Sequence, residues 1–311
     1  MSSFLITGGA GFIGTHLARR LIQQGRQVRV LDLVSPPDPV PDVQYLVGDV
    51  TRAQTLLPAM AGVDAVFHLA AIVSVPRCQE GPSESYLTNF TGTVNVLEAA
   101  RGVGVATGRM PRFVMASSAA VYGDLGRENE PLRESLSLQA PLSFYGAQKL
   151  ASEHAVLRYS RDLGLPALSF RFFNVFGAGQ DASSPYSGVI SLFAREASAK
   201  RPLRILGDGN QTRDFVAVED LVEACTRVLD LNPSRLQGQA INLGMGKAIR
   251  IRELAEIMRR ITRLEASIES GPARGGDVRH SLADVSEASA LLGWKATVDL
   301  ETGLGRMIHR V

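Results

Sequence analysis

The sequence lacks any apolar run approaching the ~18 residues that a membrane-spanning helix needs, and no basic leader precedes its first apolar segment at residues 4–6. It also lacks cysteine clusters: Cys78 and Cys225 lie far apart without metal-ligand spacing, and the five histidines are scattered singly. The formal net charge is only +2, which is too small to indicate a polyanionic partner. We therefore expect a reduced, metal-free, cytoplasmic protein that binds neither membranes nor nucleic acid.

Short apolar runs alternate with helical patterns through the first half of the chain. The runs are Phe4 to Ile6, Val28 to Leu31, Tyr45 to Val47, Ala65 to Phe67, Phe113 to Met115 and Ala167 to Phe170. This alternation predicts an α/β fold with a doubly wound parallel sheet flanked by helices. Because the chain has 311 residues, we expect a large nucleotide-binding domain with a smaller companion.

A glycine-rich segment follows the first apolar run. It satisfies both Gly8-x-x-Gly11-x-x-Gly14 and Gly9-x-Gly11-x-x-Gly14, where a predicted strand leads into a predicted helix. Such glycines allow a tight turn, so that a pyrophosphate can bind the amides at the helix N-terminus. Asp32 ends the second predicted strand, where its carboxylate can accept hydrogen bonds from an adenosine ribose. Residues 30–51 contain no lysine or arginine, so we expect a Rossmann fold that binds NAD rather than NADP.

Tyr145 and Lys149 lie four residues apart, and Tyr145 follows Ser118 by 27 positions. On a helix, residues at this spacing share one face, so the phenol and the ammonium can point the same way. A fixed cation lowers the pKa of a neighbouring tyrosine from its usual ~10, and an oxidised nicotinamide would lower it further. We therefore predict that Tyr145 acts as a base near neutral pH. The pair alone is also compatible with an ordinary surface helix.

These residues, with further motifs, resemble the extended short-chain dehydrogenase/reductase family. Within it they resemble the UDP-hexose 4-epimerases, in particular the UDP-N-acetylglucosamine 4-epimerase type. The resemblance covers nearly the whole chain, and the order and spacing of the motifs make it specific. The motifs are Thr7 to Gly14, Gly48-Asp49-Val50, His68-Leu69-Ala70-Ala71, Ser117 to Gly123, Tyr145 to Lys149, Arg171-Phe172-Phe173-Asn174, Arg213-Asp214-Phe215 and Arg274-Gly275-Gly276-Asp277.

The resemblance implies roles for individual residues. Ser118 and Tyr145 would act on the sugar 4-hydroxyl, and Lys149 would hold the nicotinamide ribose. The other implied NAD-binding residues are Gly8, Gly11, Phe12, Ile13, Gly14, Asp32, Asp49, Val50, Leu69, Ala70, Ala71, Thr88 and Phe173. The other implied substrate-binding residues are Ser74, Asn174, Val189, Arg213, Arg274, Asp277 and Ser281.

Two of these assignments have independent chemical support. Guanidinium groups match the geometry of phosphates, so Arg213 and Arg274 suit a diphosphate, although either could also be a solvated surface arginine.

His68 follows a buried strand and is expected to satisfy a backbone group, so it receives no role in the reaction.

The expected domain organisation is discontinuous. The Rossmann domain would span residues 1–173 with a returning segment at about 214–243, which includes a helix from Val218 to Leu231 and a strand from Ala240 to Leu243. A UDP-sugar-binding α/β domain would span 174–213 and 244–311, where turn-rich segments such as 183–185 occur. Gly102 to Pro111 is expected to be a surface loop. Helices over 84–101 and 145–162 occupy the places where the family pairs subunits, which implies a homodimer.

The resemblance implies a reaction without net redox change. Tyr145 would take the proton of the 4-hydroxyl while hydride leaves C4 for NAD, and the resulting 4-keto sugar would turn and receive the hydride on its other face. Related dehydratases and decarboxylases carry acidic residues after the catalytic hydroxyl, whereas this chain has Ala119 and Ala120, so we expect epimerisation. A non-enzymatic NAD-binding sensor is the alternative, but such proteins commonly lack the tyrosine or the lysine.

Substrate choice depends on fewer residues. The segments at 74–77 and 174–186 resemble epimerases of UDP-N-acetylhexosamines, and Val73 stands where glucose epimerases often have lysine. Ser281, four residues beyond Asp277, would leave room for a 2-acetamido group, although it could be an ordinary loop serine, as Ser74 could be a turn former. We predict interconversion of UDP-GlcNAc and UDP-GalNAc. UDP-glucose/UDP-galactose and UDP-uronic acids remain alternatives, because room for a larger substrate does not require one.

Overall fold

The computed structural model describes residues 2–136, 139–180, 188–263, 265, 267–273 and 275–308. The chain forms two compact units. Unit 1 comprises Met1–Val121, Ser143–Phe172 and Val222–Ile241, and unit 2 comprises Tyr122–Leu142, Phe173–Leu221 and Asn242–Val311. This division departs from the expected boundaries at residues 122–142, 173, 214–221 and 242–243. The first segment belongs to unit 2 because Leu132 N donates to Leu282 O (2.8 Å), and residues 214–217 belong there because they form part of a strand in its sheet.

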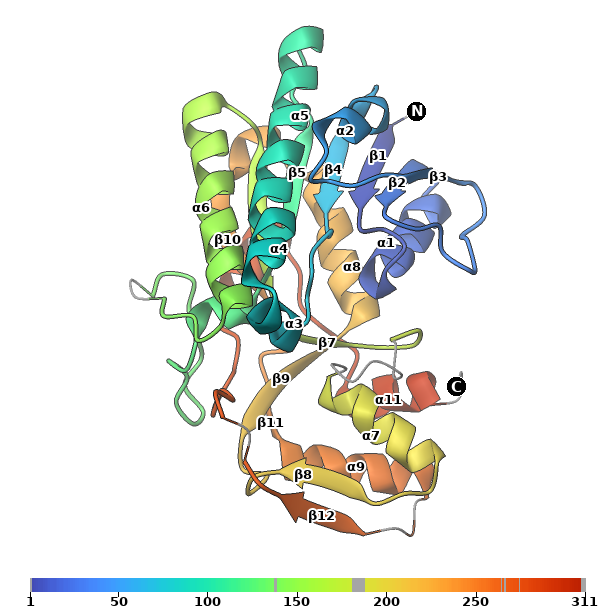
Figure 1. Ribbon diagram of the computed structural model, residues 1–311, viewed down its shortest axis with the longest axis vertical. Helices are drawn as coiled ribbons and strands as arrows, with labels where there is room; N and C mark the ends of the chain where they lie inside the picture. The colour runs from blue at the N-terminus through green and yellow to red at the C-terminus, as the bar shows by residue number, and fades with distance from the viewer. Residues whose placement is uncertain are drawn as a thin grey trace. The chain divides into compact units, whose positions relative to one another are not determined.

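A seven-stranded sheet forms the centre of unit 1 (Figure 1). Its strands are β1 (Ser3–Thr7), β2 (Gln27–Asp32), β3 (Val43–Val47), β4 (Ala65–His68), β5 (Arg112–Ser118), β6 (Ala167–Phe172) and β10 (Gln237–Leu243). The order is β10-β6-β5-β4-β1-β2-β3, and the pairs β1–β2, β1–β4, β2–β3, β4–β5 and β5–β6 are parallel. The strands β1, β2 and β3 are added toward one edge of the sheet and β4, β5 and β6 toward the other, which confirms the predicted doubly wound α/β fold.

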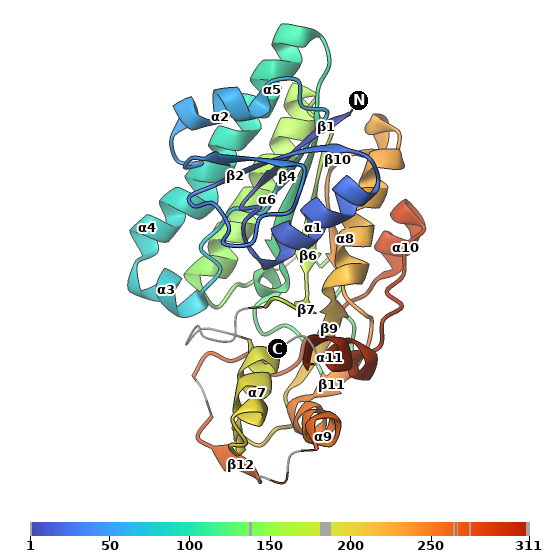
Figure 2. The same ribbon diagram turned by 90° about the vertical axis from the view of Figure 1, so that its right-hand side faces the viewer.

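Unit 1 contains the following helical segments wholly or in part. They are α1 (Phe12–Gln23), α2 (Ala53–Met60), α3 (Val75–Glu80), α4 (Pro82–Tyr86), the π-helix η1 (Leu87–Thr91), α5 (Gly92–Thr107), the 3-10 turn η2 (Ala119–Tyr122), α6 (Phe144–Leu163), α8 (Val218–Arg227), and the 3-10 turns η3 (Val228–Asp230) and η4 (Pro233–Arg235). Figure 2 shows α2, α5 and α6 on one side of the sheet and α1 on the other. The helix predicted over residues 84–101 is present as α4, η1 and α5, in which the π-helical turn η1 interrupts the α-helix.

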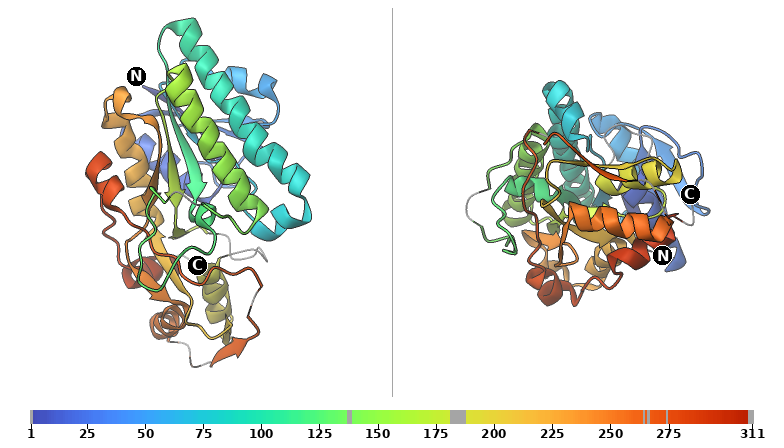
Figure 3. Two further views of the ribbon diagram at one scale, coloured as in Figure 1. Left: turned by 90° about the vertical axis from the view of Figure 1, so that its left-hand side faces the viewer. Right: turned by 90° about the horizontal axis from the view of Figure 1, so that it is seen from below.

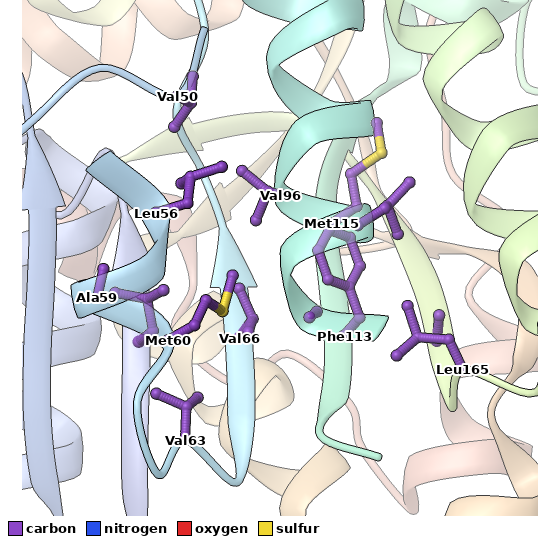
Figure 4. Close-up of a cluster of buried hydrophobic side chains, with 14 of the residues drawn as sticks. Val50, Leu56, Ala59, Met60, Val63, Val66, Val96, Phe113, Met115 and Leu165 are labelled. Atoms are coloured by element: carbon purple, nitrogen blue, oxygen red, sulfur yellow. The ribbon is translucent and has the colours of Figure 1, made fainter. Parts of the chain in front are cut away.

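The core of unit 1 lies between the sheet and the helices α2, α5 and α6 (Figure 4). Leu56 and Met60 of α2 and Val96 of α5 pack against Val66 of β4 and Phe113 of β5, and all five side chains are almost fully buried. Apolar side chains at helical spacing thus face apolar strands that are covered on both sides, which explains the uninterrupted apolar runs in the sequence.

The prediction of a surface loop from Gly102 to Pro111 is wrong. Helix α5 continues to Thr107 and ends at Gly108, which adopts a left-handed conformation (φ 71°). Gly104 is buried, and a Cβ there would lie 2.2 Å from the Met110 sulfur, so glycine is required for this close packing. Tertiary contact therefore maintains a helix across glycines that disfavour one locally.

Unit 2 contains two small sheets and several helices. The three-stranded sheet has the order β11 (Ala248–Arg250), β9 (Thr212–Ala217) and β7 (Asn174–Phe176), and β12 (Ile268–Gly271) pairs with β8 (Leu203–Leu206). Its helices are α7 (Val189–Ser198), α9 (Ile251–Thr262), α10 (Ser286–Leu292) and α11 (Leu300–Ile308). Phe176, Phe193 and Leu254 contribute to its own hydrophobic core. The predicted turn residues 183–185 lie outside the described residues.

Candidate active site

The glycine loop joins β1 to α1, and two of its glycines are required by close contacts. Gly8 has a φ of 70°, and a Cβ on it would lie 2.6 Å from the Ala70 nitrogen. A Cβ on Gly14 would lie 2.5 Å from the Gly9 Cα atom. The backbone therefore passes close to the segment after β4 and turns directly into α1.

The first turn of α1 can bind an anion. The helix begins after Gly11, no described side chain caps it, and its first turn contains no acidic residue. Amides at such a terminus lack intrahelical partners and carry the positive end of the helix dipole. The amides of Phe12 and Ile13 are thus suited to the predicted pyrophosphate of NAD.

Asp32 anchors the glycine loop. Its Oδ2 accepts a hydrogen bond from Ala10 N (2.9 Å), and its Oδ1 accepts one from Leu33 N (2.7 Å). Asp32 was expected to bind the adenosine ribose, and its contact with the glycine loop was not foreseen. One carboxylate can serve both purposes, because each oxygen has two lone pairs. The ribose contact stays a prediction.

The other predicted NAD residues of unit 1 follow the carboxyl ends of strands or lie on η1. Asp49 accepts from Thr51 N (2.8 Å) after β3, and Val50 is buried, with 6% of its surface exposed. Leu69, Ala70 and Ala71 follow β4, and Thr88 lies in the π-helical turn, a feature that is common at functional sites. Phe173 belongs to unit 2, where its amide donates to Leu243 O (3.0 Å).

Tyr145, Lys149 and Ser118 lie on two neighbouring elements of unit 1. Ser143 caps α6 by accepting from Gly146 N (3.1 Å), which places Tyr145 in the first turn and Lys149 one turn later. The Lys149 ammonium lies 5.8 Å from the centre of the Tyr145 ring and donates to Ala116 O (2.7 Å) on β5. Ser118 ends β5, accepts from Ala120 N (3.1 Å) and forms a side-chain hydrogen bond with Tyr145.

Burial dominates the electrostatics of this pair. It raises the pKa of Tyr145 to about 12, against a smaller lowering by the hydrogen bond from Ser118. Burial also lowers the pKa of Lys149 to about 8. Removing the phenolate from water thus outweighs the groups that lower the pKa of Tyr145 in the folded chain. The lowering toward neutrality that is expected from Lys149 together with an oxidised nicotinamide stays a prediction.

His68 is bonded by two hydroxyl groups. Its Nδ1 lies 2.7 Å from Thr7 Oγ1 and its Nε2 lies 2.9 Å from Thr93 Oγ1. The prediction that His68 bonds a backbone group is therefore wrong. Burial, and to a smaller extent the charge of Lys149, lowers the pKa of His68 to about 3. The imidazole is therefore neutral at physiological pH and links β1, β4 and α5.

Unit 2 brings several predicted substrate residues together around β9. Arg213 Nη2 pairs with Asp277 Oδ1 (2.6 Å), and the Arg213 side chain is only 12% exposed. Ser281 N donates to Thr212 O (3.2 Å), directly beside Arg213 in the chain. Asn174 begins β7 opposite Phe215 of β9. Arg274 lies outside the described residues.

Two further predicted residues occupy helix N-termini. Ser74 caps α3 by accepting from Arg77 N (3.2 Å), which agrees with its alternative role as a turn former. Val189 is the first residue of α7. Contact of either residue with substrate stays a prediction.

Asp214 is a structural residue that sequence reasoning did not identify. Its buried carboxylate accepts from Met245 N (2.7 Å), Gly246 N (2.9 Å) and Ala283 N (3.1 Å). Burial raises the pKa of Asp214 to about 6 although these bonds oppose the rise. The available signal was an acidic residue directly before the apolar residues Phe215 and Val216 of the same strand.

Within the described ranges, none of the helices is both long and apolar enough to cross a membrane. The sequence profile of the NAD dependent epimerase/dehydratase family matches residues 4–244.

Three proteins illustrate the similarity to known enzymes. A dTDP-L-rhamnose 4-epimerase of Burkholderia thailandensis is 31% identical over 97% of this chain and 93% of its own length. The crystal structure of a UDP-glucose 4-epimerase of Thermotoga maritima with UDP-glucose has 28% identity and a TM-score of 0.91, covering 99% of this chain and 98% of that one. The structure of a UDP-N-acetylglucosamine 4-epimerase of Methanobrevibacter ruminantium with UDP-N-acetylmuramic acid has 30% identity and a TM-score of 0.89, and the match covers 99% of this chain and 97% of that one. This chain therefore belongs to the NAD-dependent epimerase/dehydratase family.

Proposed function

We propose that this protein is an NAD-dependent 4-epimerase that interconverts UDP-GlcNAc and UDP-GalNAc through a 4-keto intermediate. The observation that carries the proposal is the grouping of Ser118, Tyr145 and Lys149 on β5 and α6, with Lys149 held by Ala116 O at 2.7 Å. A phenol beside a fixed ammonium and a hydroxyl is suited to move a proton on and off a sugar oxygen.

Each of the three residues has a distinct task in this reaction. Tyr145 accepts the proton of the 4-hydroxyl, and Ser118 donates a hydrogen bond to the same oxygen. Lys149 contributes positive charge that favours the phenolate. The glycine loop and the first turn of α1 would hold NAD, whose nicotinamide would supply the acceptor and donor of the C4 hydride. The proton returns from Tyr145 in the second half of the reaction, so no net oxidation occurs.

The residues after Ser118 favour epimerisation over elimination. Ala119 and Ala120 form the start of η2 and carry only methyl groups. Loss of a sugar hydroxyl requires an acid that protonates the leaving oxygen. Neither alanine can do this, so return of the hydride to the 4-keto sugar is the supported outcome.

The residues around β9 support a nucleotide diphosphate-sugar as substrate. The Arg213 guanidinium can bind two phosphate oxygens at once, and its pairing with Asp277 fixes its orientation. We assign Asn174, Val189, Arg274 and Asp277 to the same nucleotide, as the family resemblance implies. Ser281 lies beside this strand and is small, which supports a substrate with a 2-acetamido group.

The three named relatives differ in their sugars but share the name 4-epimerase. This common reaction supports C4 inversion more strongly than any one substrate. UDP-glucose/UDP-galactose and UDP-uronic acids are the competing substrates, and an NAD-binding sensor is the non-enzymatic alternative.

We also propose that the protein is a homodimer that pairs through residues 84–101, on α4, η1 and α5, and through residues 145–162 of α6. Figure 3 shows α6 beside α5 on one side of unit 1. Tyr86 and Leu87 are 48% and 49% exposed, and Phe144 at the start of α6 is 45% exposed. Large apolar side chains gathered on neighbouring helices are typical of an interface between subunits.

The proposal is tested by proton NMR of the anomeric sugar signals after purified protein is mixed with a nucleotide sugar. Separate samples contain UDP-GlcNAc, UDP-glucose, UDP-glucuronic acid or dTDP-rhamnose, each without and with added NAD. Appearance of UDP-GalNAc, faster than turnover in any other sample, is expected. Turnover of another sugar alone would refute the substrate assignment, and no turnover by an NAD-loaded protein would favour the sensor.

A further inference from the structure

Three consecutive residues of β5 meet three residues of α6 that are spaced one turn apart. Ser118 bonds Tyr145, and Ala116 O accepts from the Lys149 ammonium at 2.7 Å. Between them, Ser117 Oγ donates to the carboxylate of Glu153, one turn beyond Lys149. The side of α6 that carries the proposed catalytic residues thus continues into a buried acid.

Glu153 is held by a second partner, Arg171 of β6. Arg171 Nε lies 3.0 Å from Oε1 and Nη2 lies 2.7 Å from Oε2, so the guanidinium binds both carboxylate oxygens. The two side chains are only 4% and 6% exposed. Ser117 and Arg171 are paired neighbours in the β5–β6 register, so both approach Glu153 from the same face of the sheet.

Net stabilisation of the fold does not explain why this ion pair is buried. Desolvation of two charges costs about as much as their attraction returns, so a buried pair adds little net stability to a fold. Apolar residues of similar size would fill the same space between β6 and α6. The position of Glu153, one turn from Lys149, indicates that its charge serves the lysine.

The groups around Lys149 leave Glu153 as its source of negative charge in the described part of the chain. His68 of β4 is neutral because its pKa is lowered to about 3. Cys78 of α3 and, less strongly, Glu153 raise the pKa of Lys149, but Cys78 carries negative charge only as a thiolate, and burial raises the pKa of its thiol. Tyr145 is a neutral phenol, since burial raises its pKa to about 12. Burial of Lys149 itself favours the uncharged amine.

Given the function proposed above, we propose that Glu153 is a positioning residue that keeps Lys149 protonated beside Tyr145. Ser117 and Arg171 occupy both carboxylate oxygens, so Glu153 acts on Lys149 through space and does not draw its ammonium away from Ala116 O. Lys149 therefore stays where it can support the Tyr145 phenolate. Without Glu153, the nearby charge of Arg171 would oppose protonation of the lysine.

The chain allows a direct measurement, because it contains only four lysines, Lys149, Lys200, Lys247 and Lys295. Protein labelled with ¹³C at the lysine ε-carbon gives one NMR signal per lysine, and the Lys149→Met variant assigns the signal of interest. Its chemical shift is followed from pH 6 to pH 11 in the full chain without substrate. This titration reports the protonation of Lys149 independently of any turnover.

Glu153→Gln is expected to move the Lys149 titration to lower pH by about one unit or more, the size of a charge interaction across one helical turn in protein. Glu153→Asp keeps the charge and is expected to move it by less than half as much. Glu98→Gln is the matched control, because Glu98 also pairs with α6, through Tyr159, but lies outside the Lys149 cluster. It should leave the Lys149 signal unchanged.

Glu153→Gln leaves Arg171 buried without its counterion and can fail to fold. The double variant Glu153→Gln/Arg171→Gln removes both charges and is expected to shift the titration in the same direction by a smaller amount. In the active enzyme, the alkaline limb of kcat/KM should move with the NMR titration. An unchanged Lys149 titration in the single or the double variant would overturn the role of Glu153. Absence of sugar turnover with a shifted titration would instead refute the proposed function alone.

Discussion

At Tyr145, burial and the hydrogen bond with Ser118 act on the pKa of the phenol in opposite directions. Burial raises its pKa to about 12, while the Ser118 hydrogen bond lowers it by less. The phenol is therefore protonated at neutral pH until more positive charge lies beside it. We therefore predict that the positive charge of an oxidised nicotinamide lowers the pKa of Tyr145 and makes proton removal favourable.

Tyr145→Phe removes the proposed base and leaves the ring. Turnover is expected to fall by about 10²- to 10⁴-fold, the usual contribution of a general base. Copurified NAD, measured by chromatography after denaturation, is expected to remain. Tyr159→Phe is the matched control on the same helix, since the Tyr159 hydroxyl bonds the surface acid Glu98. Full activity in Tyr145→Phe would show that another group is the base.

Ser281→Tyr tests the substrate assignment by adding bulk. The value of kcat/KM for UDP-GlcNAc is expected to fall by at least about 10- to 100-fold, because a filled pocket excludes an added group. UDP-glucose turnover should persist. Ser270→Tyr, at an exposed position on β12, serves as the control for the same substitution in unit 2. Equal losses for both sugars in Ser281→Tyr would argue against a selective acetamide pocket.

Among the elements, the ends of β1 and β4 are joined to α5 by a neutral histidine. His68 bonds Thr7 of β1 and Thr93 of α5 at 2.7 and 2.9 Å. A protonated imidazole would be a donor at both nitrogens and would carry an unpaired charge into the core. The contact therefore depends on pH.

Because of this contact, the free energy of unfolding is expected to decrease as the pH falls. The pKa of His68 is about 3 in the folded protein, against 6.5 for an unperturbed histidine, so the unfolded chain binds more protons between these values. The free energy of unfolding then falls, by up to about 1.4 kcal/mol per pH unit, as pH drops from 6.5 toward 3. Asp214, with its raised pKa of about 6, opposes this loss over part of the range.

Urea unfolding at several pH values between 4 and 7 measures this slope. His68→Gln can retain one or both hydroxyl contacts without titrating, so its slope should be shallower than that of the unaltered protein. Asp214 is present in both proteins, so the difference isolates His68. His154→Gln, an exposed position on α6, provides the control. Identical slopes for the unaltered protein and His68→Gln would contradict the neutral histidine.

For the whole molecule, the proposed dimer predicts a mass twice that of the chain in light scattering at micromolar concentration. Leu87→Glu places a charge in the proposed interface and is expected to give a monomer, because burying an unpaired carboxylate is costly. Leu57→Glu on α2, where Leu57 is 69% exposed, changes the same residue type elsewhere on unit 1. A monomeric unaltered protein, or a dimeric Leu87→Glu variant, would show that this surface does not pair subunits.

The strands and the glycine loop were predictable because local patterns encode them. Apolar runs produce buried parallel strands, and the glycine spacing produces a tight turn. At Gly8 the backbone is left-handed, and at Gly14 a Cβ would collide with the Gly9 backbone. The helical spacing of Tyr145 and Lys149 likewise predicted their shared face on α6. The extension of α5 through Gly104 was not predictable, since it depends on packing against Met110.

The sequence by itself determined the α/β fold, the family and the residue types of the candidate site, because these depend on short-range periodicity and on motifs in a fixed order. Only the tertiary structure decided the protonation of these residues. Burial raised the pKa of Tyr145 and lowered that of Lys149, an effect that their spacing does not specify. It also brought Ser117, Glu153 and Arg171 together from three elements. Desolvation and long-range pairing arise from the folded environment, which no local pattern specifies.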